Sequence, residues 1–150
     1  MQFETIDQVL DFAIGKEEEA AAFYTELAEK VARPGMREVF LEFAKEERVH
    51  RARLLKVKEG QLPAVSHEQV QDLKITENLA PVTPSEGMTY PHALTLAMKA
   101  EKAAFKLYSR LADATDDPAI ADVFRSLAQE EAKHKLRFEL EYEDHVLEGV

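Results

Sequence analysis

Six residues of the types that bind metal ions occur at two matching places in the sequence. Each place combines a single Glu with a downstream Glu-x-x-His motif, and the members are Glu17, Glu47, His50, Glu101, Glu131 and His134. On a helix, the Glu and the His of such a motif lie one turn apart on the same face, so both side chains reach one site. Four carboxylates and two neutral imidazoles suit two divalent cations, because the ions' four positive charges balance the carboxylates.

The elements that must position these residues are four helices. Apolar residues spaced three or four apart predict inward-facing stripes, and each candidate ligand lies near the middle of one. Buried carboxylates without cations would repel one another and be strongly disfavoured. Metal binding is therefore the favoured interpretation. Two alternatives are surface side chains that share a helical phase by chance, and a bundle that keeps the residues but binds zinc or nothing.

An internal repeat supports the metal interpretation. A shift of 84 residues aligns the two halves without a gap, and 15 of the 44 positions from Leu10 to Arg53 are identical to their counterparts. The shift superimposes Glu17 on Glu101 and His50 on His134. Two equal halves, each with two helical stripes, predict two helical hairpins over about 5–60 and 89–146.

Start and stop signals agree with these hairpins. Thr5 with Gln8 predicts a capping box at the first helix, and Asp117 before Pro118 predicts the start of the fourth. The third helix is expected to open at Pro91. The crossover, 61–88, contains three prolines and a glycine and cannot be one long helix, although 66–74 is expected to form a short one. The expected fold is an all-α four-helix bundle made of two repeated hairpins joined by a long crossover.

Composition limits the function classes. With 150 residues, 45% hydrophobic and 32% charged, the chain suits one globular domain spanning 1–150. A net charge of -10 argues against nucleic-acid and anionic-lipid partners. The absence of cysteine excludes disulfides, thiolate catalysis and iron–sulfur centres. With no apolar run of membrane-spanning length and no signal-like N-terminus, we expect no membrane partner and a cytoplasmic location.

Two tyrosines share the stripes of the lone glutamates. Tyr24 and Tyr108 lie two turns after Glu17 and Glu101. Their hydroxyls either hydrogen-bond a ligand carboxylate or donate an electron, or the rings are ordinary core aromatics. Ala20 and its counterpart Ala104 lie between each Glu and Tyr. They leave room for a small oxidant, or they simply allow close helix packing.

Two charged positions beside the candidate ligands, a glutamate and an arginine, recur in both halves. Glu46 and Glu130 fall off the inward stripes, so they are either solvated or hold outer hydrogen bonds. Arg53 and Arg137 follow the two histidines by three residues, and we expect them to pair with carboxylates on a neighbouring helix.

The chain resembles the rubrerythrin-like branch of the ferritin-like di-iron carboxylate superfamily over about 5–146. The resemblance rests on the segments 43–50 (FAKEERVH) and 127–134 (LAQEEAKH). It implies a ferritin-like bundle in which Glu47 and Glu131 bridge two irons. It further implies that His50 and His134 each bind one iron, and that Glu17 and Glu101 bind terminally.

The resemblance also implies an activity: reduction of hydrogen peroxide, or of O₂, at two iron ions. Alternatives are ferritin-type iron oxidation and storage, or a non-enzymatic bundle, and zinc and manganese remain alternative metals. Two features depart from typical rubrerythrins. Ala104 stands where they carry a further carboxylate that moves on redox change, and no Cys-rich rubredoxin domain is present. An external electron donor is therefore expected, and so is a homodimer or higher homo-oligomer.

Overall fold

The computed structural model describes residues 3–32, 34–62, 70–78 and 84–147. Most of these residues form four α-helices: α1 (Ile6–Lys30), α2 (Pro34–Lys58), α3 (Tyr90–Ala114) and α4 (Pro118–Tyr142). A 3₁₀ turn, η1 (Ile75–Asn78), lies in the crossover, and a π-helical turn, η2 (Glu143–Leu147), follows α4. The described residues contain no strand beyond an isolated bridge between Val31 and Met88. The predicted all-α class is confirmed, and no described helix is long and apolar enough to cross a membrane.

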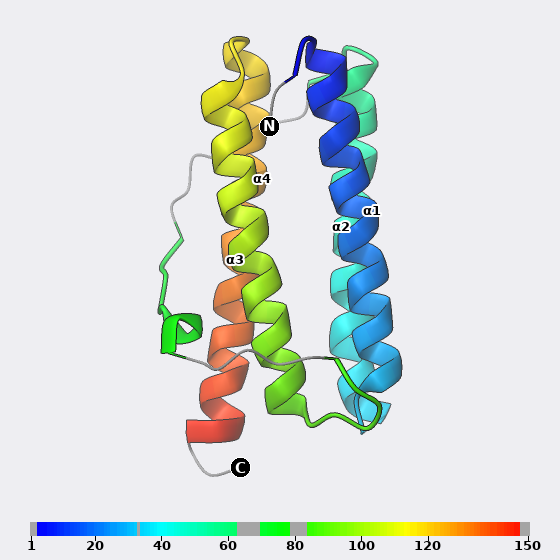
Figure 1. The fold of residues 1–150 in the computed structure, drawn as a ribbon, viewed down its shortest axis with the longest axis vertical. Coiled ribbons are helices and arrows are strands. Elements are labelled where there is room, and N and C mark those ends of the chain that lie inside the picture. Colours follow the sequence, from blue (N-terminus) through cyan, green and yellow to red (C-terminus); the bar gives the residue numbers. More distant parts are fainter. Residues whose placement is uncertain (1–2, 33, 63–69, 79–83, 148–150) are drawn as a thin grey trace.

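The repeat in the sequence is a repeat in the structure. All four α-helices have 25 residues, and α3 and α4 begin and end 84 residues after α1 and α2. Helix α1 packs along α2, and α3 packs along α4, so each half is a helical hairpin (Figure 1). Residues 70–78 of the crossover run along the outer side of the second hairpin, whereas Met88 near its end pairs with Val31 at the end of α1 (Figure 1).

Side-chain caps define where the helices begin. The Thr5 hydroxyl accepts from the backbone N–H of Gln8, and the Asp117 carboxylate accepts from the first N–H groups of α4. The side chain of Gln8 accepts from the N–H of Glu4, one residue before the position that a capping box requires. Helix α3 starts one residue earlier than predicted, because Thr89 is its cap.

The prediction of a short helix over 66–74 is wrong where it can be assessed. Residues 66–69 lie outside the described part of the chain, and 70–74 are not helical; the nearest helical turn is η1. Lys74 has a positive φ of 57°, which interrupts any helix there. The N–H of Val70 donates to the side chain of Gln129 on α4, so this backbone group is satisfied without a helix.

A buried carboxylate on α4 holds the crossover in place. Glu139 is fully buried and accepts hydrogen bonds from the backbone N–H groups of Leu73 and Ile75. Lys135, one turn earlier, lies 3.0 Å from Glu139 and 2.5 Å from Asp72 of the crossover. The buried charge is therefore paired and fully hydrogen-bonded, which is the condition under which such a group is tolerated.

The core is divided into two apolar clusters. The first joins the end of α1 to the start of α2 and α3 and includes Tyr24, Leu27, Phe40, Phe43, Leu94 and Phe138. The second lies toward the opposite ends of the helices and includes Leu10, Leu54, Leu111, Val123, Phe124 and Leu127. The six candidate ligands fall between the clusters in every helix. A polar layer thus separates the two apolar clusters.

Leu10→Ala tests how much the second apolar cluster contributes to the stability of the fold. Leu10 is 1% exposed, so its truncation should lower the free energy of unfolding by about 2–5 kcal/mol. Leu41→Ala is the matched control, because Leu41 is 42% exposed and the same change there should cost no more than about 0.5 kcal/mol. Urea unfolding with excess chelator measures both. Equal costs would contradict this assignment of the core.

Candidate metal centre

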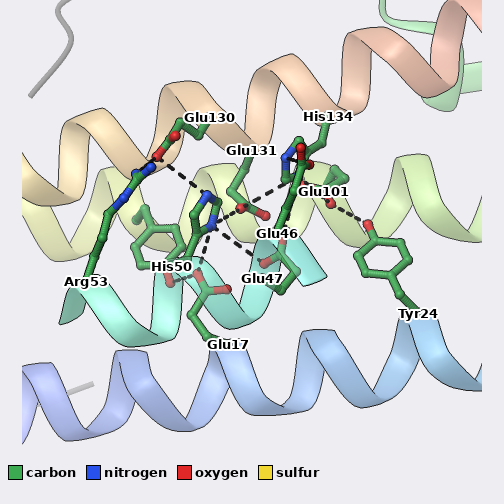
Figure 2. A network of polar contacts seen from close by, with 11 residues as sticks. Glu17, Tyr24, Glu46, Glu47, His50, Arg53, Glu101, Glu130, Glu131 and His134 are labelled. Carbon is green, nitrogen blue, oxygen red and sulfur yellow. Dashed lines mark hydrogen bonds and ion pairs between the residues drawn. The ribbon is translucent and has the colours of Figure 1, made fainter. Parts of the chain in front are cut away.

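All six predicted residues meet in the polar layer. Each helix contributes a glutamate, and α2 and α4 each add a histidine one turn later (Figure 2). All six residues are buried, and the four glutamates are at most 2% exposed. Carboxylates in an interior of low polarity need cations or protons close by.

The donor atoms form two sets that overlap. One set contains Glu17, Glu47, His50 and Glu131, and the other contains Glu47, Glu101, Glu131 and His134. Within each set, one donor atom from every residue lies within 4.8 Å of the others. Glu47 and Glu131 belong to both sets. The arrangement can therefore hold two cations side by side with two shared carboxylates.

Both imidazoles direct the same nitrogen inward. His50 Nδ1 lies 2.9 Å from a Glu131 oxygen, and His134 Nδ1 lies 3.1 Å from a Glu47 oxygen. The two rings are nearly parallel, with centroids 5.7 Å apart. Each Nε2 points away from the centre, so Nδ1 is the atom available to an ion.

Several buried polar atoms of the centre make no hydrogen bond. They are Glu17 Oε2, both Glu47 oxygens, Glu101 Oε2, Glu131 Oε1, His50 Nδ1 and His134 Nδ1. Unpaired buried acceptors are rare and costly in proteins. All six residues contribute to the set, and oxygen and imidazole nitrogen donors suit first-row divalent metals. The residues present therefore fit a pair of metal ions.

Without cations, protons must neutralise the layer. Burial raises the pKa of Glu47 to about 10, with added repulsion from Glu131. Burial and the charge of Glu101 likewise raise the pKa of Glu131 well above its usual value. For His50, burial alone would lower the pKa, but nearby Glu131 and Glu17 raise it. For Glu17, burial would raise the pKa, but contacts led by His50 lower it.

The two tyrosines bond to the lone glutamates of the opposite hairpin. Tyr24 on α1 donates to Glu101 on α3, and Tyr108 on α3 donates to Glu17 on α1. Burial, together with the carboxylate that each contacts, raises the pKa of both hydroxyls, so they keep their protons and act as donors. The rings also pack in the apolar clusters, so both interpretations of these residues describe part of their environment.

The outward nitrogens of the histidines face Glu46 and Glu130. His134 Nε2 lies 2.7 Å from Glu46, and His50 Nε2 lies 3.5 Å from Glu130, which also pairs with Arg53 (Figure 2). The sequence left two interpretations of these glutamates, solvation and outer hydrogen bonds. The structure shows part of both, because Glu46 is 47% exposed and each glutamate lies close to the outward nitrogen of a histidine. The available signal was their recurrence at the same offset in both halves.

The centre is reached from two sides with different chemistry. A cavity of about 500 Å³ between α1 and α3 is mainly apolar and reaches Glu101 and Glu131. Its lining includes Ala20, Phe23 and Ala104. A second cavity of about 400 Å³ between α2 and α4 reaches both histidines and is lined mainly by charged side chains. A largely apolar lining and a largely charged lining therefore face different sides of the centre.

Metal removal should destabilise the protein, and more strongly at pH 8 than at about pH 5.5. A glutamate whose pKa is higher in the folded state binds more protons when the protein is folded. The free energy of unfolding of the metal-free protein therefore falls as pH rises through the range between the unfolded-state pKa and the folded-state pKa, which we call the window of that group. For Glu47, this window runs from the ordinary glutamate pKa of 4.5 to about 10. Raised pKa values of Glu131 and His50 act in the same direction. Melting temperatures with and without chelator at both pH values measure the effect.

Glu47→Gln isolates the cause, because it removes the group that must take up a proton. We expect the metal-free variant to melt higher than the metal-free parent at pH 8 and to depend less on pH. Glu42→Gln removes the same charge from an exposed position on α2 and should change neither property. Identical melting of the parent protein with and without metal at pH 8 would refute the prediction.

Comparisons with known proteins bear on the fold and the family. The family model described as Rubrerythrin matches residues 8–142. A solved structure titled "Hypothetical Protein Pfu-1136390-001" from Pyrococcus furiosus is similar at 28% sequence identity and a TM-score of 0.63. The similarity covers 93% of this chain and 89% of that one. No match was found among curated proteins. Because the family model spans most of the sequence, the chain belongs to the rubrerythrin family.

Proposed function

We propose that this protein is a di-iron oxidoreductase that reduces hydrogen peroxide with electrons from an external donor. The observation that carries the proposal is the pair of donor sets that share Glu47 and Glu131. In the proposed assignment these two carboxylates bridge the ions. Glu17 and His50 complete one position, and Glu101 and His134 complete the other.

The proposed reaction needs two electrons and two protons. When bound, two ferrous ions supply one electron each, and with two protons these convert H₂O₂ into two molecules of water. The external donor then returns the two electrons. A carboxylate-rich donor set favours iron in this role, because anionic oxygen is a good ligand for the hard ferric ion.

The cavity between α1 and α3 supports the proposal that the oxidant is small and neutral. Most of its lining residues are apolar, although Lys16, Glu19 and Arg110 also line it, and it leads to Glu101 and Glu131. Alanine at positions 20 and 104 keeps side-chain bulk away from this route. Hydrogen peroxide and O₂ both meet these requirements of size and charge.

The tyrosines hold the terminal carboxylates. Each hydroxyl donates to the Oε1 atom of its glutamate, which leaves the Oε2 atom buried without a hydrogen bond. One oxygen of Glu17 and one of Glu101 are thereby fixed, and the other is free to face an ion. Their positions are set by partners on the opposite hairpin, so the two hairpins must be assembled before either terminal ligand is oriented.

The metal stoichiometry tests the proposal. Anaerobic titration of metal-free protein with Fe²⁺ should saturate near two ions per chain. His50→Ala and His134→Ala should each weaken the binding of one ion more than that of the other, because each donor set contains one histidine. Exposed His92 gives the matched control, since His92→Ala should leave both ions unchanged. Saturation at one ion, or insensitivity to both histidine substitutions, would rule out the two-ion centre.

The choice of oxidant is tested by mixing the diferrous protein with H₂O₂ or O₂ at equal concentration. We expect peroxide to react faster, as the family resemblance implies, with the ferric absorption followed by stopped flow. Faster reaction with O₂ and retention of many irons by an assembled shell would favour iron storage. If neither oxidant changes the spectrum, the redox proposal is wrong and a structural or zinc site takes its place.

Ala104→Glu tests the departure from typical rubrerythrins. With Ala104, the two halves offer nearly the same donors, so nothing obvious drives one ion to move on oxidation. We expect Ala104→Glu to raise peroxide turnover with a saturating reductant, since it supplies the carboxylate that the family resemblance implies. Ala114→Glu adds the same charge at an exposed position at the end of α3 and should not raise turnover. Unchanged turnover in Ala104→Glu would contradict the prediction.

A further inference from the structure

We infer that Glu46 and Glu130 are positioning residues that orient the histidine of the opposite hairpin, and that they do so unequally. As a result, the two ion positions differ in strength although the halves share their ligands. The inference rests on the proposed two-ion centre, but it concerns residues outside the two donor sets.

The stronger contact joins Glu46 on α2 to His134 on α4. The His134 Nε2 atom lies 2.7 Å from Glu46 Oε2, within hydrogen-bond distance. A proton donated from Nε2 fixes the tautomer and leaves the Nδ1 lone pair facing the centre. Phe43 packs against the same ring edge-on, at 4.7 Å between centroids. His134 is therefore held by the close contact with Glu46 and by packing against Phe43.

The equivalent contact in the other half is weaker. His50 Nε2 lies 3.5 Å from Glu130 Oε2, and the same oxygen pairs with Arg53. An acceptor engaged by a guanidinium is a poorer acceptor for the imidazole. Glu130 thus divides its charge between two cationic or donor groups, whereas Glu46 has the shorter contact with its histidine.

The arginines account for this difference. Arg137 is the counterpart of Arg53 in the repeat, but its guanidinium lies over the Phe43 ring at 5.0 Å. The difference follows from the sequence. Arg137 faces Phe43 of the first half, whereas the residue equivalent to Phe43 in the second half, which would face Arg53, is Leu127. Arg53 has no aromatic ring at that place and pairs with Glu130 instead. One aromatic residue thereby breaks the symmetry of the outer contacts.

A carboxylate that accepts from the far nitrogen of a ligating histidine raises the basicity of the ligand and restricts its rotation. The ion in the set with Glu101 and His134 should therefore bind more tightly than the ion in the set with Glu17 and His50. Co²⁺ is a suitable probe, because its visible absorption reports binding at each position without any redox step.

The experiment is a Co²⁺ titration of the metal-free full chain. Glu46→Gln should weaken the tighter ion by about 10–100-fold, the usual effect of losing such a partner. Glu130→Gln should weaken the other ion, and by less. The matched control is Glu42→Gln, which removes one charge from an exposed site one turn before Glu46 and should leave both affinities unchanged.

A double-mutant cycle separates positioning from a general charge effect. The loss caused by Glu46→Gln should disappear in a His134→Ala background and persist in a His50→Ala background. In zinc-loaded protein labelled with ¹⁵N, the Nε2-bound proton of His134 should shift in Glu46→Gln and not in Glu42→Gln. In an Arg53→Gln background, Glu130→Gln should have a larger effect than in the parent, because Glu130 is released to His50.

Three outcomes overturn the inference: no effect of Glu46→Gln, an equal effect in both histidine backgrounds, or equal effects of Glu46→Gln and Glu130→Gln. These outcomes are distinct from failure of the proposed function. A protein that binds two Co²⁺ ions with the expected pattern, but whose iron form reacts with no oxidant, would retain the inference and lose the redox proposal.

Discussion

The mutual repulsion of four buried carboxylates governs this structure. Glu17, Glu47, Glu101 and Glu131 occupy one layer between two apolar clusters, where their burial leaves little water to screen them. Only counter-charge inside the layer makes such an arrangement tolerable, and the inward Nδ1 atoms of the histidines complete sets of donors that suit cations. The apolar clusters above and below supply the stability that holds this unfavourable layer together.

Each hairpin supplies hydrogen-bond or ion-pair partners to the candidate ligands of the other hairpin. Tyrosine on one hairpin bonds to the terminal glutamate of the other, and each outer glutamate faces the histidine across the interface. Direct helix packing is concentrated within each hairpin, and both the apolar clusters and the polar layer join one hairpin to the other. Assembly of the bundle and formation of the centre are therefore coupled.

Residues whose positions follow from helical periodicity were predictable from the sequence. The repeat and the stripes placed Glu47, His50 and their counterparts at one level, and Pro118 marked a helix start that the structure confirms. Contacts that depend on tertiary structure were not predictable. The crossover follows side chains of α4, above all Glu139, which no local pattern at 66–74 reveals. Likewise, the partner of Glu46 lies on another helix, so only its recurrence in the repeat hinted at a role.

The reciprocal contacts have an evolutionary consequence. Because the tyrosine–glutamate contacts between the halves occur in two copies related by the 84-residue shift, two identical hairpins paired by a two-fold axis would present the same six donors and the same tyrosine partners. Duplication and fusion of one hairpin gene could then have preserved a working centre from the first generation. Such a fusion would leave each copy free to change alone, which is consistent with the different surroundings of Arg53 and Arg137.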